Sequence, residues 1–166
     1  MLLGCQISAL HAQENNLQNV SDQLATIHLM IERSHIDSVK VRYQKMIHET
    51  GLPAVTLDLP DGLYRGETPA DDYKYKHVVE FEVKLGKIVR LDYDEVHEGG
   101  HGKERDKAYC KKMSIAGTTP AIAYPIYEKA LLEKQNLDEL DAVSGASYSL
   151  YRFKLAVAYA LINGTL

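Results

Sequence analysis

Two stretches of alternating apolar and polar residues, separated by a short turn, constrain the fold of this chain most strongly. Residues 77–84 alternate apolar with charged side chains, and residues 88–96 return with apolar residues after Gly86-Lys87. Successive side chains of a strand point to opposite faces, so this alternation is typical of a sheet with one buried and one solvated face. A glycine turn of this length joins antiparallel strands. The sequence therefore predicts a β-hairpin.

Other elements are predicted on both sides of the hairpin. The turn signal Asp61-Gly62 precedes an extended segment at residues 63–66. Pro120 and Pro125 precede a helix at about residues 126–134, and apolar residues spaced as on one helical face predict a last helix over residues 150–161. Strands and helices in this mixture predict a single α+β domain, with an antiparallel sheet packed against helices.

The N-terminal third is harder to interpret. Between residues 21 and 50 the apolar side chains mostly fit one helical face, and Gly51-Leu52-Pro53 is a stop signal. Residues 38–43 also alternate, so a strand remains an alternative there. We expect residues 21–53 to form a helical extension, and the polar residues 1–20 to act as a tether.

Composition excludes several classes of protein. The 166 residues carry 19 Lys and Arg against 23 Asp and Glu, a net charge of -4, and 45% of them are hydrophobic. This is ordinary for one globular domain with a real core. No apolar run approaches the roughly 18 residues of a membrane span. Basic residues occur at most in pairs, so nucleic acid is not an expected partner.

Cys5 follows Leu2-Leu3-Gly4, which resembles the lipobox of bacterial lipoproteins, whose cysteine becomes the lipidated first residue. The basic segment and apolar core of a signal peptide do not precede it. Either the start of the chain is truncated, or the match is fortuitous in a cytoplasmic protein. The polar stretch that follows favours truncation and lipidation at Cys5, and thus an extracytoplasmic protein anchored to a membrane.

His97 and His101 lie four residues apart in a segment that reads HEGGHGKERD. On a helix this spacing would place both imidazoles on one face, as in a metal site. Three glycines make a helix improbable, and Glu98 alone does not complete a ligand set, so we predict a solvated loop and no metal site.

The segment 141–149 holds small and hydroxyl residues just before the last helix. Free N–H groups and the positive end of the helix dipole gather at such a terminus. The terminus would suit a phosphate, because glycine lets an anion approach the backbone donors. Physical chemistry alone leaves a second interpretation open, in which the hydroxyls only cap the helix.

The same segment resembles a family signature, Asp-x-x-Ser-Gly-Ala-Thr/Ser. It is the flavinylation motif of the FMN-binding domain of the C subunit of sodium-pumping NADH:quinone oxidoreductase and the G subunit of Rnf complexes. The matching residues are Asp141, Ser144, Gly145, Ala146 and Ser147.

Two further landmarks extend the resemblance over about residues 61–161. Residues 61–67 are similar to the Asp-Gly-x-Tyr-x-Gly opening of that domain, and residues 83–89 are similar to its Gly-Lys-Ile hairpin. The resemblance therefore implies an FMN-binding domain over residues 54–166.

The resemblance implies a covalent cofactor. In the family a separate flavin transferase, using FAD and magnesium, attaches FMN through its phosphate to the last hydroxyl of the motif, which is Ser147 here. Threonine is the usual acceptor, so serine is a departure from the pattern. Ser144, Gly145, Ala146 and nearby backbone donors would hold the phosphate.

Three more residues receive roles from this interpretation. Tyr148 and Tyr151 could stack on the flavin ring, although tyrosines on a helix are more often core residues. Asp141 looks like part of what the transferase recognises, together with magnesium. The loop at residues 97–106 would flank the flavin.

The expected function is that of an extracytoplasmic electron-transfer flavoprotein, a carrier more than a complete enzyme. Its partners would be the transferase, a redox donor or acceptor protein, and the membrane. Two alternatives remain: FMN bound non-covalently at the same helix terminus, or a cofactor-free interaction or adhesion module with the same fold.

Overall fold

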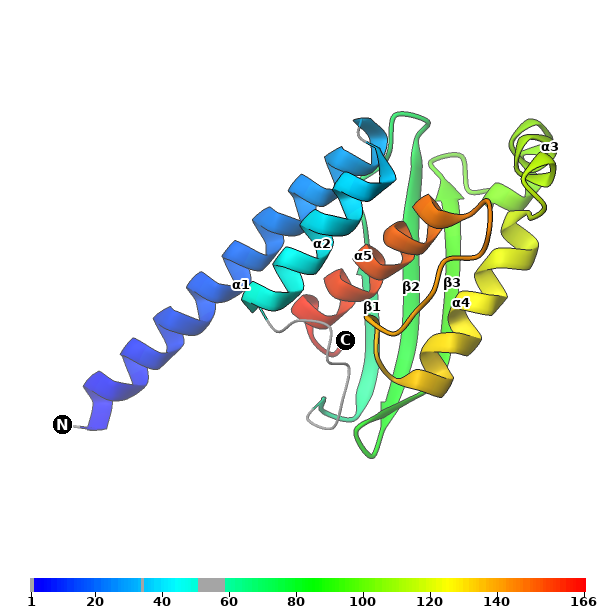
Figure 1. Ribbon diagram of the computed structural model, residues 1–166. Helices are drawn as coiled ribbons and strands as arrows, with labels where there is room; N and C mark the ends of the chain where they lie inside the picture. Colours follow the sequence, from blue (N-terminus) through cyan, green and yellow to red (C-terminus); the bar gives the residue numbers. More distant parts are fainter. Residues whose placement is uncertain (1, 34, 51–58) are drawn as a thin grey trace.

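The computed structural model describes residues 2–33, 35–50 and 59–166. They form an antiparallel sheet and helices that pack on one of its faces (Figure 1). The predicted α+β class is confirmed.

The sheet has the strand order β1-β2-β3, with β1 at Gly62–Glu67, β2 at Tyr75–Lys84 and β3 at Lys87–His97. Both neighbouring pairs are antiparallel, so the predicted hairpin and the extended segment before it are confirmed. The turn is centred on Leu85-Gly86, one residue earlier than expected. Both residues have positive φ, 52° and 70°, which a tight turn matching the strand twist requires.

Two helices cover the sheet. Helix α4 (Pro120–Lys134) packs on β3, and α5 (Ser147–Asn163) packs on β1 and β2. The prediction that α4 begins near residue 126 was wrong, because proline is well tolerated in a first helical turn and Pro125 is accommodated inside the helix. Between β3 and α4 lie the short helix η1 (Lys103–Arg105) and α3 (Lys107–Ile115), which was not predicted.

The N-terminal third is a pair of helices, α1 (Leu2–Arg33) and α2 (Ile36–Thr50). The alternative strand at residues 38–43 is wrong, because this range lies inside α2. The expected single helical stretch is interrupted between α1 and α2, which pack against each other and against α5 (Figure 1). Cys5 belongs to α1, but its side chain lies outside the described residues.

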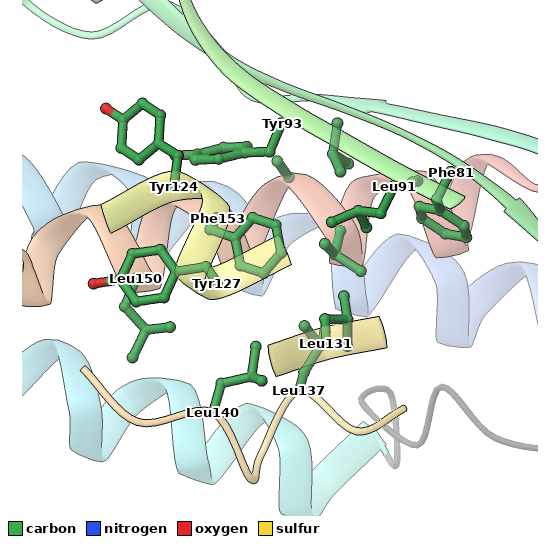
Figure 2. Close-up of a cluster of buried hydrophobic side chains, with 14 of the residues drawn as sticks. Phe81, Leu91, Tyr93, Tyr124, Tyr127, Leu131, Leu137, Leu140, Leu150 and Phe153 are labelled. Carbon is green, nitrogen blue, oxygen red and sulfur yellow. The ribbon is translucent and has the colours of Figure 1, made fainter. Parts of the chain in front are cut away.

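The hydrophobic core has two parts, one on each side of α5. The first fills the space between the sheet, α4 and α5, and centres on aromatic side chains such as Phe81, Tyr93 and Phe153 (Figure 2). The second joins α5 to α1 and α2 through residues that include Tyr43, Tyr151 and Leu155. Helix α5 is therefore the central element, which explains why most of its residues are buried.

Candidate functional site

The turn that leads into α5 is held in place by glycine geometry and by Tyr127. Gly145 has φ +79°, and a Cβ there would lie 2.6 Å from the Cβ of Ala116. The Tyr127 hydroxyl donates to the carbonyl oxygen of Ala146 at 2.8 Å and lies 3.3 Å from the amide nitrogen of Val143, which donates to it. Burial raises the pKa of Tyr127 to about 12, so this hydroxyl keeps its proton at neutral pH. The turn is thus anchored to α4.

Helix α5 begins at Ser147, three residues before the predicted range 150–161, so the predicted helix terminus lies within the segment 141–149. The N-cap residue is Ala146, and no side chain at that position accepts a hydrogen bond from the first turn. Ser149, one of the hydroxyl residues of the segment 141–149, is instead buried. Ala146 therefore supplies no side-chain cap to α5. No capping oxygen at this position compensates the positive end of the helix dipole.

Ser147 is half-buried and lines a cavity of about 360 Å³ between α2, α5 and residues 138–142. Asp141 and Tyr151 line the same cavity, so the fold brings together three of the residues singled out from the sequence. Tyr151 is nearly buried and meets Tyr43 edge to face, with ring centroids 5.5 Å apart. The volume falls within the range of small-molecule pockets.

Asp141 is fully exposed at the edge of this cavity. Its carboxylate lies 3.8 Å from the Lys134 ammonium, a surface ion pair that adds little to stability. The side chain is thus accessible to another protein and contributes little to the stability of the fold.

Lys154 was missed by the sequence analysis. It lies on the cavity wall, 4% exposed, with its ammonium 5.3 Å from the ring centroid of Tyr43 and 5.7 Å from that of Tyr151. Burial lowers its pKa to about 8, while Asp138 and Asp141 act in the opposite direction. Helical spacing could have found it, because positions 147, 151 and 154 share one face of a helix.

Other expected site residues lie away from the cavity. Tyr148 is 39% exposed and is not part of the cavity wall. Ser144 and Gly145 are exposed on the turn before α5, and Ala146 is buried beneath it. None of residues 97–102 lines this cavity, so the loop does not flank Ser147.

The arrangement offers a nucleophile, a cation and an aromatic wall in one place. Ser147 supplies a hydroxyl at the positive end of α5, and Lys154 supplies a positive charge on a wall that Asp37, Asp138 and Asp141 also line. Such a combination suits a phosphorylated ligand with a planar ring system, because the phosphate needs donors and positive charge while the ring needs an aromatic surface.

No known family model matches the chain. Among solved structures, a crystal structure of a Clostridium perfringens protein is 39% identical and covers 64% of this chain and 88% of its own, with a TM-score of 0.58. A solution structure of a Clostridium thermocellum protein is 26% identical, with a TM-score of 0.40, over 61% of this chain and 89% of its own.

Across the helices that the structure describes, none is long and apolar enough to span a membrane. A curated relative, the 15 kDa lipoprotein of Treponema pallidum (strain Nichols), is 34% identical over 98 residues, which cover 58% of this chain and 70% of the relative. The chain therefore belongs to the family of the Treponema pallidum 15 kDa lipoprotein.

Proposed function

We propose that this protein is an extracytoplasmic electron-transfer flavoprotein, with FMN attached through its phosphate to Ser147. The observation that carries the proposal is the position of Ser147. It is the first residue of α5 and faces a cavity that Asp141, Tyr151 and Lys154 also line. The acceptor hydroxyl of the motif thus shares one cavity with a cation and an aromatic side chain, which supports the proposal.

The attachment step has a simple chemical balance. The Ser147 oxygen attacks the FMN phosphorus of FAD, the bond between the two phosphates breaks, AMP leaves, and the serine proton passes to a base of the transferase. Asp141 would help the transferase and its magnesium ion to recognise the segment, which agrees with a fully exposed carboxylate next to the cavity. Serine has the hydroxyl that this reaction requires.

The residues of the chain would then hold the product. Backbone donors of the first turn of α5 and the ammonium of Lys154 would stabilise the phosphate, and Tyr151 would limit access of water to one side of the cavity. When bound, the flavin supplies one-electron and two-electron chemistry, and the protein sets its exposure and potential.

The anchor is supported by two observations. A relative 34% identical to this chain is named a lipoprotein, and Cys5 follows a lipobox-like Leu2-Leu3-Gly4. We propose lipidation at Cys5, with α1 standing between the membrane and the domain. Covalent attachment would suit this location, because a cofactor lost outside the cytoplasm is not recovered.

Co-expression with a flavin transferase tests the attachment. We expect the denatured chain to gain the mass of FMN less one water and to fluoresce in a denaturing gel. Ser147→Ala should abolish the gain, Ser147→Thr should keep or raise it, and the control Ser114→Ala, at an exposed serine of α3 outside the motif and the cavity wall, should retain it. Flavin that binds but is released on denaturation would show the non-covalent alternative, and no flavin in either form would show a cofactor-free module.

A further inference from the structure

Three buried side chains with metal-binding atoms meet at the end of the sheet remote from the hairpin turn. His77 and Glu95 are direct partners across β2 and β3, and both side chains are 0% exposed. Asp71, in the turn before β2, is 93% buried. One ligand atom from each residue lies within 4.8 Å of the other two. This cluster takes no part in the flavin site.

His77 and Glu95 each have one polar atom fixed by a hydrogen bond and another that makes no hydrogen bond among the described residues. The Nδ1 atom of His77 lies 2.9 Å from the Tyr93 hydroxyl, and the Tyr124 hydroxyl donates to Oε2 of Glu95. Among the described residues, Nε2 of His77 and Oε1 of Glu95 have no hydrogen-bond partner, although they lie 3.6 Å apart. Hydrogen bonds that orient one atom of a ligand are the usual support of a metal site.

Asp71 repeats the pattern. Its Oδ1 accepts hydrogen bonds from the backbone N–H groups of Tyr73 and Tyr75, at 2.9 and 2.8 Å, while Oδ2 has no partner within the described part of the chain. Each unpartnered buried polar atom costs about 1–3 kcal/mol. Oδ2 of Asp71 and Nε2 of His77 make no hydrogen bond among the described residues, and Oε1 of Glu95 has only ion-pair partners at 3.5 Å or more, so the three atoms can accept a shared occupant.

We propose that Oδ2 of Asp71, Nε2 of His77 and Oε1 of Glu95 bind one divalent transition-metal ion of the zinc type. One imidazole and two carboxylates form a donor set that Zn²⁺ accepts, whereas Mg²⁺ and Ca²⁺ prefer oxygen ligands alone. Three protein ligands leave a further coordination position for water or a ligand.

Two cations face the same carboxylate. Arg152 is hydrogen-bonded to Glu32 and lies 3.9 Å from Oε1 of Glu95, so its charge is already matched. Lys103 has its ammonium 3.5 Å from the same oxygen and 3.5 Å from the ring centroid of Tyr75. Lys103 is thus the direct competitor of a metal ion, and the two should exclude each other.

A route to the cluster exists on the same side. A cavity of about 300 Å³ is lined by Asp71, Lys103 and Arg152, together with Tyr73 and Tyr109. On this proposal the flexible side chain of Lys103 moves into this space when a metal enters, since Asp71 and Lys103 both line the cavity.

Zn²⁺ alone, titrated into the EDTA-treated full chain without an affinity tag, tests the site by calorimetry. We expect one Zn²⁺ per chain. Asp71→Asn keeps the oxygen that accepts the two backbone hydrogen bonds but loses the second oxygen, so it should weaken Zn²⁺ binding at least tenfold. Lys103→Met removes the competing cation and should strengthen Zn²⁺ binding at least tenfold. His101→Gln, which removes one of the two stacked imidazoles of the exposed loop, should leave binding unchanged.

Co²⁺ provides a second measurement that needs no destabilising substitution. Visible absorption bands of bound Co²⁺ should appear with the unaltered chain and saturate at lower Co²⁺ in Lys103→Met. The absence of Zn²⁺ binding by the unaltered chain, a loss of binding in His101→Gln, or unchanged affinity in Lys103→Met would overturn the proposal. Circular dichroism checks that each variant is folded.

Discussion

Replacing Lys154 by methionine should stabilise the protein at neutral pH. An ordinary lysine has a pKa near 10.5, and that of Lys154 is about 8. Each factor of ten in proton affinity corresponds to about 1.4 kcal/mol, so the buried charge costs roughly 3 kcal/mol at pH 7. Methionine fills a similar volume without a charge. The loss of the contacts with two tyrosine rings subtracts about 0.5–1 kcal/mol each, which leaves a net gain of about 1–2 kcal/mol.

The effect of Lys154 must depend on pH in a defined direction. Its pKa is lower in the folded chain than in the unfolded chain, so its cost is fully present below pH 8 and disappears as the pH rises toward 10.5. The advantage of the methionine variant should therefore fall by about 2 kcal/mol between pH 7 and pH 9.5.

Urea unfolding of both proteins at these two pH values provides the assay. A variant less stable than the parent at pH 7, or a difference in unfolding free energy that does not change with pH, would refute the assignment of Lys154 as a costly buried cation. The expected result would mean that the charge of Lys154 lowers the stability of the chain. Binding the phosphate of a flavin would then explain why a lysine occupies this position.

Three further substitutions test the turn before α5. Gly145→Ala should cost at least about 2 kcal/mol of unfolding free energy, because φ is +79° and the new Cβ would lie 2.6 Å from that of Ala116; thermal denaturation would measure it. Tyr127→Phe should cost about 1–3 kcal/mol, because the N–H of Val143 loses its acceptor and the carbonyl oxygen of Ala146 keeps only the N–H of Leu150, and unchanged stability would contradict that role. Asp141→Ala should leave the unfolding free energy within about 0.5 kcal/mol but reduce flavin loading by the transferase, and full loading would remove its proposed role.

The hairpin was predictable because alternation is a local signal. The same alternation also carried a signal that was not used: His77 is in phase with Val79 and Phe81, which predicts a buried imidazole. Glu95 is in phase with Tyr93 in the same way. The pairing of His77 with Glu95 could not be predicted from the sequence. It depends on the register of β2 against β3, which the whole sheet determines.

The candidate site was predictable only where it is continuous in the chain. The motif and the start of α5 at Ser147 follow from local residues. The opposite wall comes from α2, and no local pattern indicates that this helix packs beside residues 138–142. Helix α3 was missed because it has only nine residues, of which Met113 alone is buried, and so short a segment leaves a weak periodic signal.

Peptide mapping of the chain loaded by the transferase tests the central claim most directly. Tandem mass spectrometry of a digest would locate the FMN phosphoester on one residue. The account predicts that Ser147 alone carries it, in a peptide that also contains the unmodified Ser144 and Ser149. Flavin attached to Ser144 or Ser149 would contradict the account. So would a chain that gains no mass after co-expression and yields no flavin-bearing peptide.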